Sequence, residues 1–378
     1  MDFSLSEEQE MFRRSIRKFF DQHGQTSIAR DVVKGNTTSL DKVTRGLVEL
    51  GCTGMTVSEE FEGSGLGSLD LVPVFEELGR ALLPGTLLET IGFAIPILEK
   101  YGTDEQKQKY LPEIAAGTKK MTLAWLEPKK GYNPDSVGVT ASAEGESLVI
   151  NGVKSLIPDG DVVDTYILLV RTMDGKDGAG LSLVLLDRED TGITVRHQKC
   201  FDETQRLAEV TFENVRVSKS QVLGAMNQGW DVLQEGLLHL NGALCSLMVG
   251  GMDRIVEMTA EYATIRVQFG QPIGRFQAIK HGIVDMKTDL ETARSLSYYA
   301  NWALETDVDD KKAAIYSARA FITEAYIRIA SQSIQIHGGI GVTEELDCQL
   351  YLKRARYYEN YLGSVQQYRE KTALALNW

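Results

Sequence analysis

The chain has 378 residues, of which 43% are hydrophobic and 25% charged, the composition of a globular protein with room for two or three compact units. Its formal net charge of −13 argues against a nucleic-acid surface, because phosphate neutralisation needs clustered Lys and Arg. The N-terminal sequence MDFSLSEEQEMF lacks a secretion signal, and no apolar run approaches the roughly 20 residues of a membrane span. We therefore expect a cytoplasmic protein.

The first third of the sequence predicts helices. Ser6 followed by Gln9 suits a capping box, and apolar residues then recur at helical spacing. Further helices are predicted over 40–51, 68–82 and 86–101.

From about Met121 the pattern changes to β-rich runs bounded by Gly and Asp, such as TYILLVRT, LSLVLLDRE and AEVTFENVRV. After LGAMNQGW the pattern returns to long helices. These helices are predicted over 230–263, 275–304 and 310–337, and Gly338-Gly339 ends the last of them.

The order predicts an α+β fold with three domains. An N-terminal α-helical domain spans 1–118, a middle antiparallel β-domain spans 119–226, and a C-terminal four-helix bundle spans 227–378. The cysteines are widely separated and lack metal-site spacing, so we expect buried reduced thiols and no metal. They are Cys52, Cys200, Cys245 and Cys348.

Four motifs in this order resemble those of the acyl-CoA dehydrogenase family. RVQFGQPIGRFQAIKH resembles the family's Arg-x-x-Phe-Gly motif, and QIHGGIGVTEE resembles its Gln-x-x-Gly-Gly segment. LAWLEP stands where the family has its Leu-Thr-Glu-Pro flavin strand, and FENVRVSKSQVLG is similar to the end of its β-domain. The resemblance covers the full length of the chain.

The resemblance implies a homotetramer-like assembly that binds FAD between the β-domain and the C-terminal helices. Residues matching Arg266 and Gln335 reach the FAD of a neighbouring subunit in this family. A guanidinium is a good bidentate partner for pyrophosphate, and paired glycines let the backbone approach a phosphate. The alternatives are a surface salt bridge for Arg266 and a simple helix cap for the glycines. The predicted cofactor-binding residues are Arg266, Gln268, Phe269, Gln335, Gly338 and Gly339.

The family's reaction needs a base that removes the α-proton of an acyl-CoA thioester, and the family uses a glutamate. Alignment through the Gln-x-x-Gly-Gly motif places Leu362 at the usual position of that glutamate. A minority of members carry the base on the first long helix of the bundle, where Leu240 stands here. Asn241 then stands where an Arg usually follows.

Nearby carboxylates offer no confident replacement. Glu359 is predicted to pair with Arg356, and Glu235 lies on a different helix face from Leu240. Glu89, within the apolar run LLETIGFA, is a weak candidate for a displaced base. A helix-surface or capping role is the alternative that we favour for it.

The resemblance also indicates losses in the flavin strand. Leu126 replaces a Thr hydroxyl, and Tyr132 stands at a substrate-contacting Ser. Leu156 replaces a Trp that packs on the flavin ring, and Pro158 removes a hydroxyl and a backbone donor. The β-domain half of the flavin site is therefore predicted to be degraded.

These features predict the non-catalytic subunit of a heteromeric acyl-CoA dehydrogenase, with FAD bound mainly by a paralogous subunit that carries the glutamate. The expected partners also include an acyl-CoA substrate and an electron acceptor such as electron-transfer flavoprotein. Two alternatives remain open. One is a self-sufficient acyl-CoA dehydrogenase-like enzyme with a relocated base, and the other is a non-catalytic scaffold of the same fold.

Overall fold

The computed structural model describes residues 5–378, which form two compact units. The first unit combines the chain up to Leu40 with Ser68–Leu83 and Asn241–Trp378, and the second combines Asp41–Gly67 with Pro84–Leu240. The boundary therefore falls inside one long helix, between Leu240 and Asn241.

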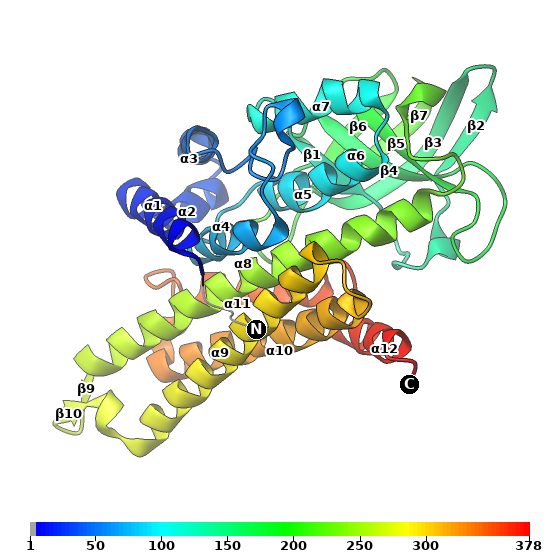
Figure 1. Cartoon of the computed structure of the whole chain (residues 1–378). Coiled ribbons are helices and arrows are strands. Elements are labelled where there is room, and N and C mark those ends of the chain that lie inside the picture. The colour runs from blue at the N-terminus through cyan, green and yellow to red at the C-terminus, as the bar shows by residue number, and fades with distance from the viewer. Residues whose placement is uncertain (1–4) are drawn as a thin grey trace. The chain divides into compact units, whose positions relative to one another are not determined.

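The first unit is helical, and three long helices dominate it (Figure 1). The long helices end within two residues of their predicted bounds, and the capping box of Ser6 and Gln9 is present. A short hairpin of two strands, β9 and β10, connects α8 to α9. The elements are α1 (Glu7–His23), α2 (Ser27–Val33), α4 (Ser68–Arg80), the later part of α8 (Gly229–Ile265), β9 (Val267–Gln268), β10 (Gln271–Pro272), α9 (Gln277–Glu305), α10 (Lys311–His337), α11 (Cys348–Asn360) and α12 (Val365–Ala375).

Glycines let α4 and α8 approach each other with their backbones in contact. A Cβ atom at Gly250 would lie 1.8 Å from the carbonyl oxygen of Glu76, and one at Gly79 would lie 1.8 Å from that of Leu247. Any larger residue would force these helices apart, so the glycines fix the packing from which the rest of α8 extends.

The second unit is built on one eight-stranded sheet with the order β6-β7-β3-β2-β4-β5-β8, and β1 also pairs with β4. The β-domain prediction is confirmed, although β1 and β2 pair with β4 in parallel. The strands are β1 (Met121–Ala124), β2 (Thr140–Glu144), β3 (Ser147–Pro158), β4 (Thr165–Arg171), β5 (Leu181–Asp187), β6 (Ile193–Gln198), β7 (Leu207–Ser218) and β8 (Val222–Leu223). The helices are α3 (Thr38–Glu49), α5 (Leu87–Glu89), a π-helical turn (Thr90–Ala94), α6 (Ile95–Tyr101), α7 (Asp104–Ala115) and the first turns of α8.

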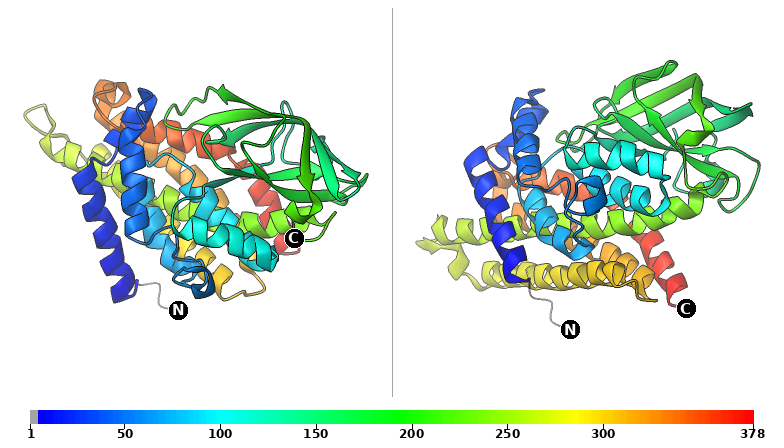
Figure 2. Two further views of the ribbon diagram at one scale, coloured as in Figure 1. Left: turned by 90° about the horizontal axis from the view of Figure 1, so that it is seen from above. Right: turned by 45° about the horizontal axis from the view of Figure 1, so that its top comes forward.

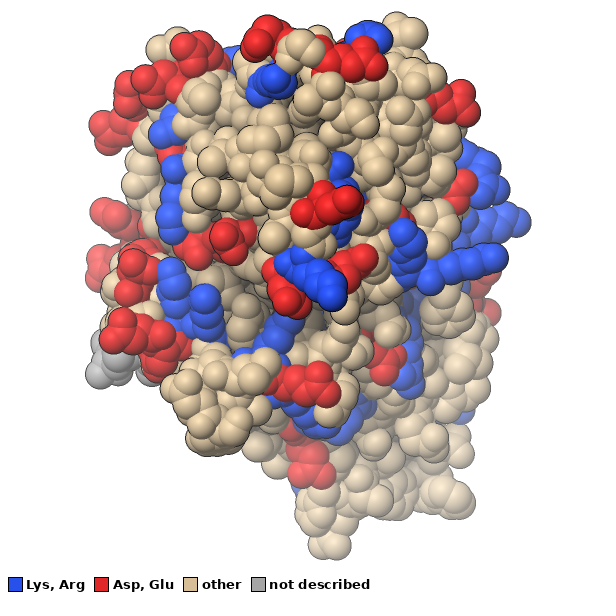
Figure 3. Space-filling view, turned by 90° about the vertical axis from the view of Figure 1, so that its right-hand side faces the viewer, with Lys and Arg blue, Asp and Glu red and all other residues tan. Residues whose placement is uncertain are grey.

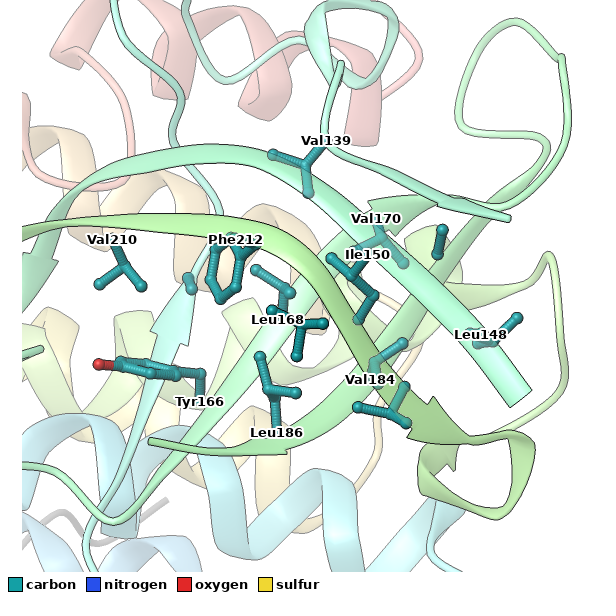
Figure 4. Close-up of a cluster of buried hydrophobic side chains, with 14 of the residues drawn as sticks. Val139, Leu148, Ile150, Tyr166, Leu168, Val170, Val184, Leu186, Val210 and Phe212 are labelled. Carbon is teal, nitrogen blue, oxygen red and sulfur yellow. The ribbon is translucent and has the colours of Figure 1, made fainter. Parts of the chain in front are cut away.

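Alternate residues of the central strands fill the core on one side of the sheet (Figure 4). Tyr166 and Leu168 of β4 lie beside Phe212 of β7, and all three are fully or almost fully buried. The rings of Tyr166 and Phe212 meet edge to face, with centroids 6.4 Å apart. This core gives β3, whose last residues Leu156 and Pro158 belong to the predicted flavin site, a rigid base.

One helix, α8, is long and apolar enough to cross a membrane by length and composition alone, although no apolar run of that kind was expected from the sequence. Most of the apolar stretch of α8, 83%, is buried inside the protein, as in a core helix.

Three cysteines are buried free thiols, whereas Cys200 is only half-buried, so the expectation of burial was wrong there. On the face shown in Figure 3, acidic and basic side chains are interspersed.

Candidate functional site

The position assigned to the family's glutamate lies in a tight, buried turn of the first unit. Leu362 follows the end of α11, is 4% exposed and has a φ of 63°, a left-handed conformation that is uncommon for leucine. The hydroxyl of Tyr368 donates a hydrogen bond of 3.0 Å to the carbonyl oxygen of Leu362. The turn therefore places an apolar side chain at this position, and the hydrogen bond from Tyr368 fixes the backbone of the turn.

A buried arginine on α10 holds the start of this turn. Arg319 is 1% exposed, and one of its terminal nitrogens donates to the carbonyl oxygens of Tyr358 at 2.7 Å and Tyr361 at 2.9 Å. Its Nε donates to Asn241 Oδ1 at 3.1 Å, and Thr323 also accepts from it. Because these acceptors are neutral, the cation acts as a cap for the carbonyl groups at the end of α11.

The second assigned position of the base is equally apolar. Leu240 is 0% exposed within α8, and the neighbouring Asn241 is also buried. Asn241 stands where the family usually has an arginine. Here a guanidinium reaches this position from α10, because Arg319 donates a hydrogen bond to the side chain of Asn241. No carboxylate occupies either assigned position.

Two of the nearby carboxylates are engaged in ion pairs. Glu359 lies 3.0 Å from Arg356, as predicted, and Glu235 lies 2.6 Å from Lys100. These contacts give both carboxylates a structural partner.

Glu89 is buried in the second unit, which corrects the surface or capping role favoured from the sequence. It is 4% exposed at the junction between α5 and the π-helical turn. Burial raises the pKa of Asp159 to about 7, while Arg206 opposes the rise and the charge of Glu89 adds to it. Glu89 therefore belongs to a buried group of charged side chains at the end of β3.

The predicted flavin strand is fixed by a buried lysine. Lys154 of β3 donates to the carbonyl oxygen of Trp125 at 2.9 Å and to Glu127 at 3.0 Å. Burial lowers the pKa of Lys154 to about 8, and Glu127 opposes this shift. The backbone N–H of Ser155 donates to the carbonyl oxygen of Leu126, so the two segments that would face a flavin run side by side.

The side chains on these two segments offer few polar groups to a flavin. Leu156 is 46% exposed with a φ of 54°, and its backbone N–H is already bound to Gln198 Oε1 at 2.7 Å. Pro158 is buried at the end of β3. The ring of Trp125 meets that of Tyr132 edge to face at 4.7 Å. Pro158 thus stands where the resemblance has a hydroxyl, Leu156 where it has the ring of a Trp, and Tyr132 where it has a Ser.

The predicted cofactor-binding residues of the first unit are, by contrast, exposed. Arg266, Gln268 and Phe269 lie in the β9–β10 hairpin beyond α8, and Phe269 is 91% exposed with a φ of 52°. Among residues 5–378, the guanidinium of Arg266 takes part in no ion pair or hydrogen bond. The expected alternative of a surface salt bridge for Arg266 is therefore absent from the described chain.

The second predicted segment lies at the end of α10. Gln335 is exposed, and so are Gly338, with a φ of 66°, and Gly339. A Cβ atom at either glycine would meet nothing within 4 Å. Gly338 also caps α10, because its backbone N–H donates to carbonyl oxygens in the last turn of the helix. The alternative role of a helix cap is therefore present, but capping does not account for the open space beside both glycines.

Comparison with known proteins agrees with the sequence resemblance. Family models of the N-terminal, middle and C-terminal domains of acyl-CoA dehydrogenases match residues 6–118, 122–215 and 227–376. The chain belongs to the acyl-CoA dehydrogenase family. This is a family of FAD-dependent oxidoreductases, and its three-part α+β fold is the one described above.

Individual relatives match over almost the whole chain. A probable acyl-CoA dehydrogenase, YngJ of Bacillus subtilis (strain 168), is 30% identical over 95% of this chain and 95% of its own length. The structure of butyryl-CoA dehydrogenase from Megasphaera elsdenii has a TM-score of 0.93 at 25% identity, with both chains fully covered. The FAD complex of PigA has a TM-score of 0.92 at 26% identity, covering 100% of this chain and 99% of that one.

The residues of the first unit suit a dinucleotide cofactor better than those of the second. Arg266 offers an unengaged guanidinium, and the two glycines offer open backbone, and each is a kind of group that can contact a pyrophosphate. Arg319 is not predictable from the sequence, because a buried cation on α10 gives no local signal of the turn that it caps.

Proposed function

We propose that this chain is the non-catalytic subunit of a heteromeric acyl-CoA dehydrogenase that completes a FAD site in a partner subunit. The observation that carries the proposal is the burial of leucine at both positions assigned to the base, Leu240 at 0% and Leu362 at 4% exposure. A leucine cannot accept the α-proton, and loss of a general base typically costs about 10²–10⁴-fold in rate.

The contrast between the two cofactor halves supports a partner. Arg266, Gln335 and Gly338–Gly339 are exposed, as residues that reach a cofactor outside their own chain must be. Leu126 and Pro158 supply no side-chain donor to a flavin of the chain's own. In this proposal, Arg266 binds the pyrophosphate and the glycines admit it closely.

When bound, FAD accepts the hydride from the β-carbon of the acyl-CoA. The residues of this chain hold that cofactor, and the glutamate of the partner takes the proton. A paralogous dehydrogenase subunit is thus the required partner. Electron-transfer flavoprotein is the expected electron acceptor, and we place the complex in the cytoplasm.

A self-sufficient enzyme with a relocated base is the second candidate, and the burial of Glu89 favours it. Glu89 is a carboxylate that is 4% exposed in an apolar helical turn, and a buried carboxylate in apolar surroundings is the kind of group that serves as a base in an active site. However, the charge of Glu89 contributes to the raised pKa of Asp159, so a structural role within a cluster of charged side chains also fits.

The discriminating experiment uses the chain co-expressed with a paralogous dehydrogenase subunit encoded by an adjacent gene. Bleaching of the flavin by a panel of acyl-CoA thioesters is followed for the complex and for two variants. A glutamate-to-glutamine change in the partner's Tyr-Glu-Gly-Thr segment should abolish bleaching, whereas Glu89→Gln in this chain should leave it unchanged. Loss of bleaching in Glu89→Gln alone would reverse the assignment and support the second candidate.

A further inference from the structure

Two exposed segments of the first unit must act together if they are to hold one cofactor. One is the hairpin that begins at Arg266, beyond α8, and the other is the end of α10 from Gln335 to Gly339. They belong to different helices and are far apart in the sequence. Their spacing therefore depends on whatever joins the ends of α8 and α10.

A stacked pair of rings joins these two helix ends. Tyr262, in the last turn of α8, stacks on His337, the last residue of α10, with ring centroids 4.3 Å apart and planes 29° apart. The tyrosine hydroxyl also makes a longer contact of 3.4 Å with the carbonyl oxygen of His337. The backbone N–H of Arg266 donates to the carbonyl oxygen of Tyr262, and Gly338 directly follows His337. Each ring therefore lies at the end of the helix from which one exposed segment begins.

Hydrogen bonds fix the orientation of the histidine ring. Its Nδ1 lies 2.8 Å from the carbonyl oxygen of Ser333, which can only accept, so Nδ1 carries the proton. The Ser333 hydroxyl lies 2.8 Å from Thr259 Oγ1, which itself donates to the carbonyl oxygen of Ile255. Burial lowers the pKa of His337, although its bond to Ser333 opposes this shift, so a neutral ring faces Tyr262. This chain of bonds ties α10 to α8 one turn behind the stack.

The other end of the glycine segment is fixed as well. Asp347, just before α11, lies 2.5 Å from Arg30 Nη2 and accepts from Thr26 Oγ1 at 2.6 Å. Arg30 also donates to the carbonyl oxygen of Glu344 at 2.6 Å. Gly338 and Gly339 therefore sit on a segment that is anchored on both sides yet exposed in the middle.

We propose that Tyr262 and His337 are positioning residues, which set the separation of Arg266 from Gly338–Gly339 so that both reach the same FAD. This inference rests on the cofactor role proposed above for those segments. Tyr262 and His337 act by keeping the ends of α8 and α10 in register.

The test measures the dissociation constant for FAD by quenching of flavin fluorescence, in the oligomer in which the chain purifies with its partner. Tyr262→Leu removes the stack, and Tyr262→Phe removes only the hydroxyl. Tyr299→Leu is the matched control, because Tyr299 stacks on Trp302 at 5.8 Å and 25° within the same unit. Arg266→Ala reports whether the half-site itself binds FAD. The thermal midpoint of each cofactor-free variant is measured alongside.

We expect Tyr262→Leu to weaken FAD binding about tenfold, with Tyr262→Phe within about threefold of the native chain and Tyr299→Leu unchanged. Near-native affinity in Tyr262→Phe would show that the stacked ring, and not the hydroxyl, sets the affinity for FAD. Tyr299→Leu should lower the thermal midpoint without changing FAD affinity, which separates a positioning effect from a general loss of stability. Native affinity in Tyr262→Leu, with Arg266→Ala still weakened, would overturn the positioning role alone. Native affinity in both would overturn the proposed half-site as well. Loss in Tyr262→Leu without loss in Arg266→Ala would also contradict the role stated here.

Discussion

The turn at Leu362 and the two segments around Arg266 and Gly339 lie in the same unit but are built in opposite ways. The turn is buried, its carbonyl groups are capped by Arg319, and its side chain is apolar. The exposed segments present an unengaged guanidinium and bare glycine backbone. The comparison teaches that one helical scaffold can combine a buried, apolar turn with exposed segments that carry an unengaged cation and open backbone.

The second unit extends the same contrast. Its core and its Lys154–Glu127 pair keep the flavin strand ordered, yet the side chains along that strand are leucine, proline and aromatic rings. A disordered strand would indicate general decay of the fold. Here the strand keeps its place in the sheet, while the side chains along it differ from those that the family resemblance predicts.

The largest effect is expected from removing the cap of the Leu362 turn. Arg319→Met removes the hydrogen bonds that the guanidinium donates to the carbonyl oxygens of Tyr358 and Tyr361 and to Asn241 Oδ1, at a cost of about 3 kcal/mol. Thermal unfolding followed by circular dichroism should show a clearly lowered midpoint. Arg356→Met, which removes a largely exposed pair with Glu359, should change the midpoint little. Equal midpoints for the two variants would show that Arg319 does not fix the turn.

An intermediate effect is expected from adding a methyl group at Gly339, in the exposed segment at the end of α10. Gly339→Ala meets nothing within 4 Å, so the free chain should keep its stability, whereas an approaching pyrophosphate would be obstructed. FAD affinity of the assembled complex, measured by fluorescence quenching, should fall about tenfold.

Gly131→Ala is the matched control, because Gly131 is also open and lies in the altered loop of the second unit. It should leave FAD affinity unchanged. Weakening by Gly131→Ala and not by Gly339→Ala would place the cofactor on the opposite half of the chain.

A smaller, pH-dependent effect is expected at Asp159, beside Glu89. Burial raises the pKa of Asp159 to about 7, so the unfolded chain releases this proton at lower pH than the folded chain does. The stability contributed by the protonated acid is present below the ordinary aspartate pKa and is lost as pH rises towards about 7. Asp159→Asn should therefore gain in stability relative to the native chain between pH 5 and 7, by at most about 1.4 kcal/mol per pH unit, and level off above that. A difference in unfolding midpoint that does not change across this range would refute the assignment.

The smallest expected effect is on activity when a carboxylate is restored at the turn. Leu362→Glu should not give the chain dehydrogenase activity on its own, because the flavin strand of the second unit still lacks its hydroxyl donors. The midpoint of unfolding should fall, since a carboxylate at a site that is 4% exposed loses hydration. Turnover of any acyl-CoA by this single variant, measured as flavin bleaching, would mean that only the base was missing.

The sequence predicts the elements well where the signal is local. The Ser6 capping box and the Glu359–Arg356 pair are both decided within one helical turn, and both are present. The burial of Glu89 was not predictable, because helical periodicity does not distinguish a π-helical turn under a sheet from a surface helix. The Arg319 cap and the Tyr262–His337 stack join residues distant in sequence, so no local pattern indicates them.

The most direct test of the central claim is the ratio of bound FAD to protein chains, measured from the visible flavin absorbance of the purified assembly. We predict a chain that is nearly colourless when purified alone. With its partner, it should form a yellow complex containing half as many flavins as chains. A yellow, active homo-oligomer with one FAD for every chain would contradict the account.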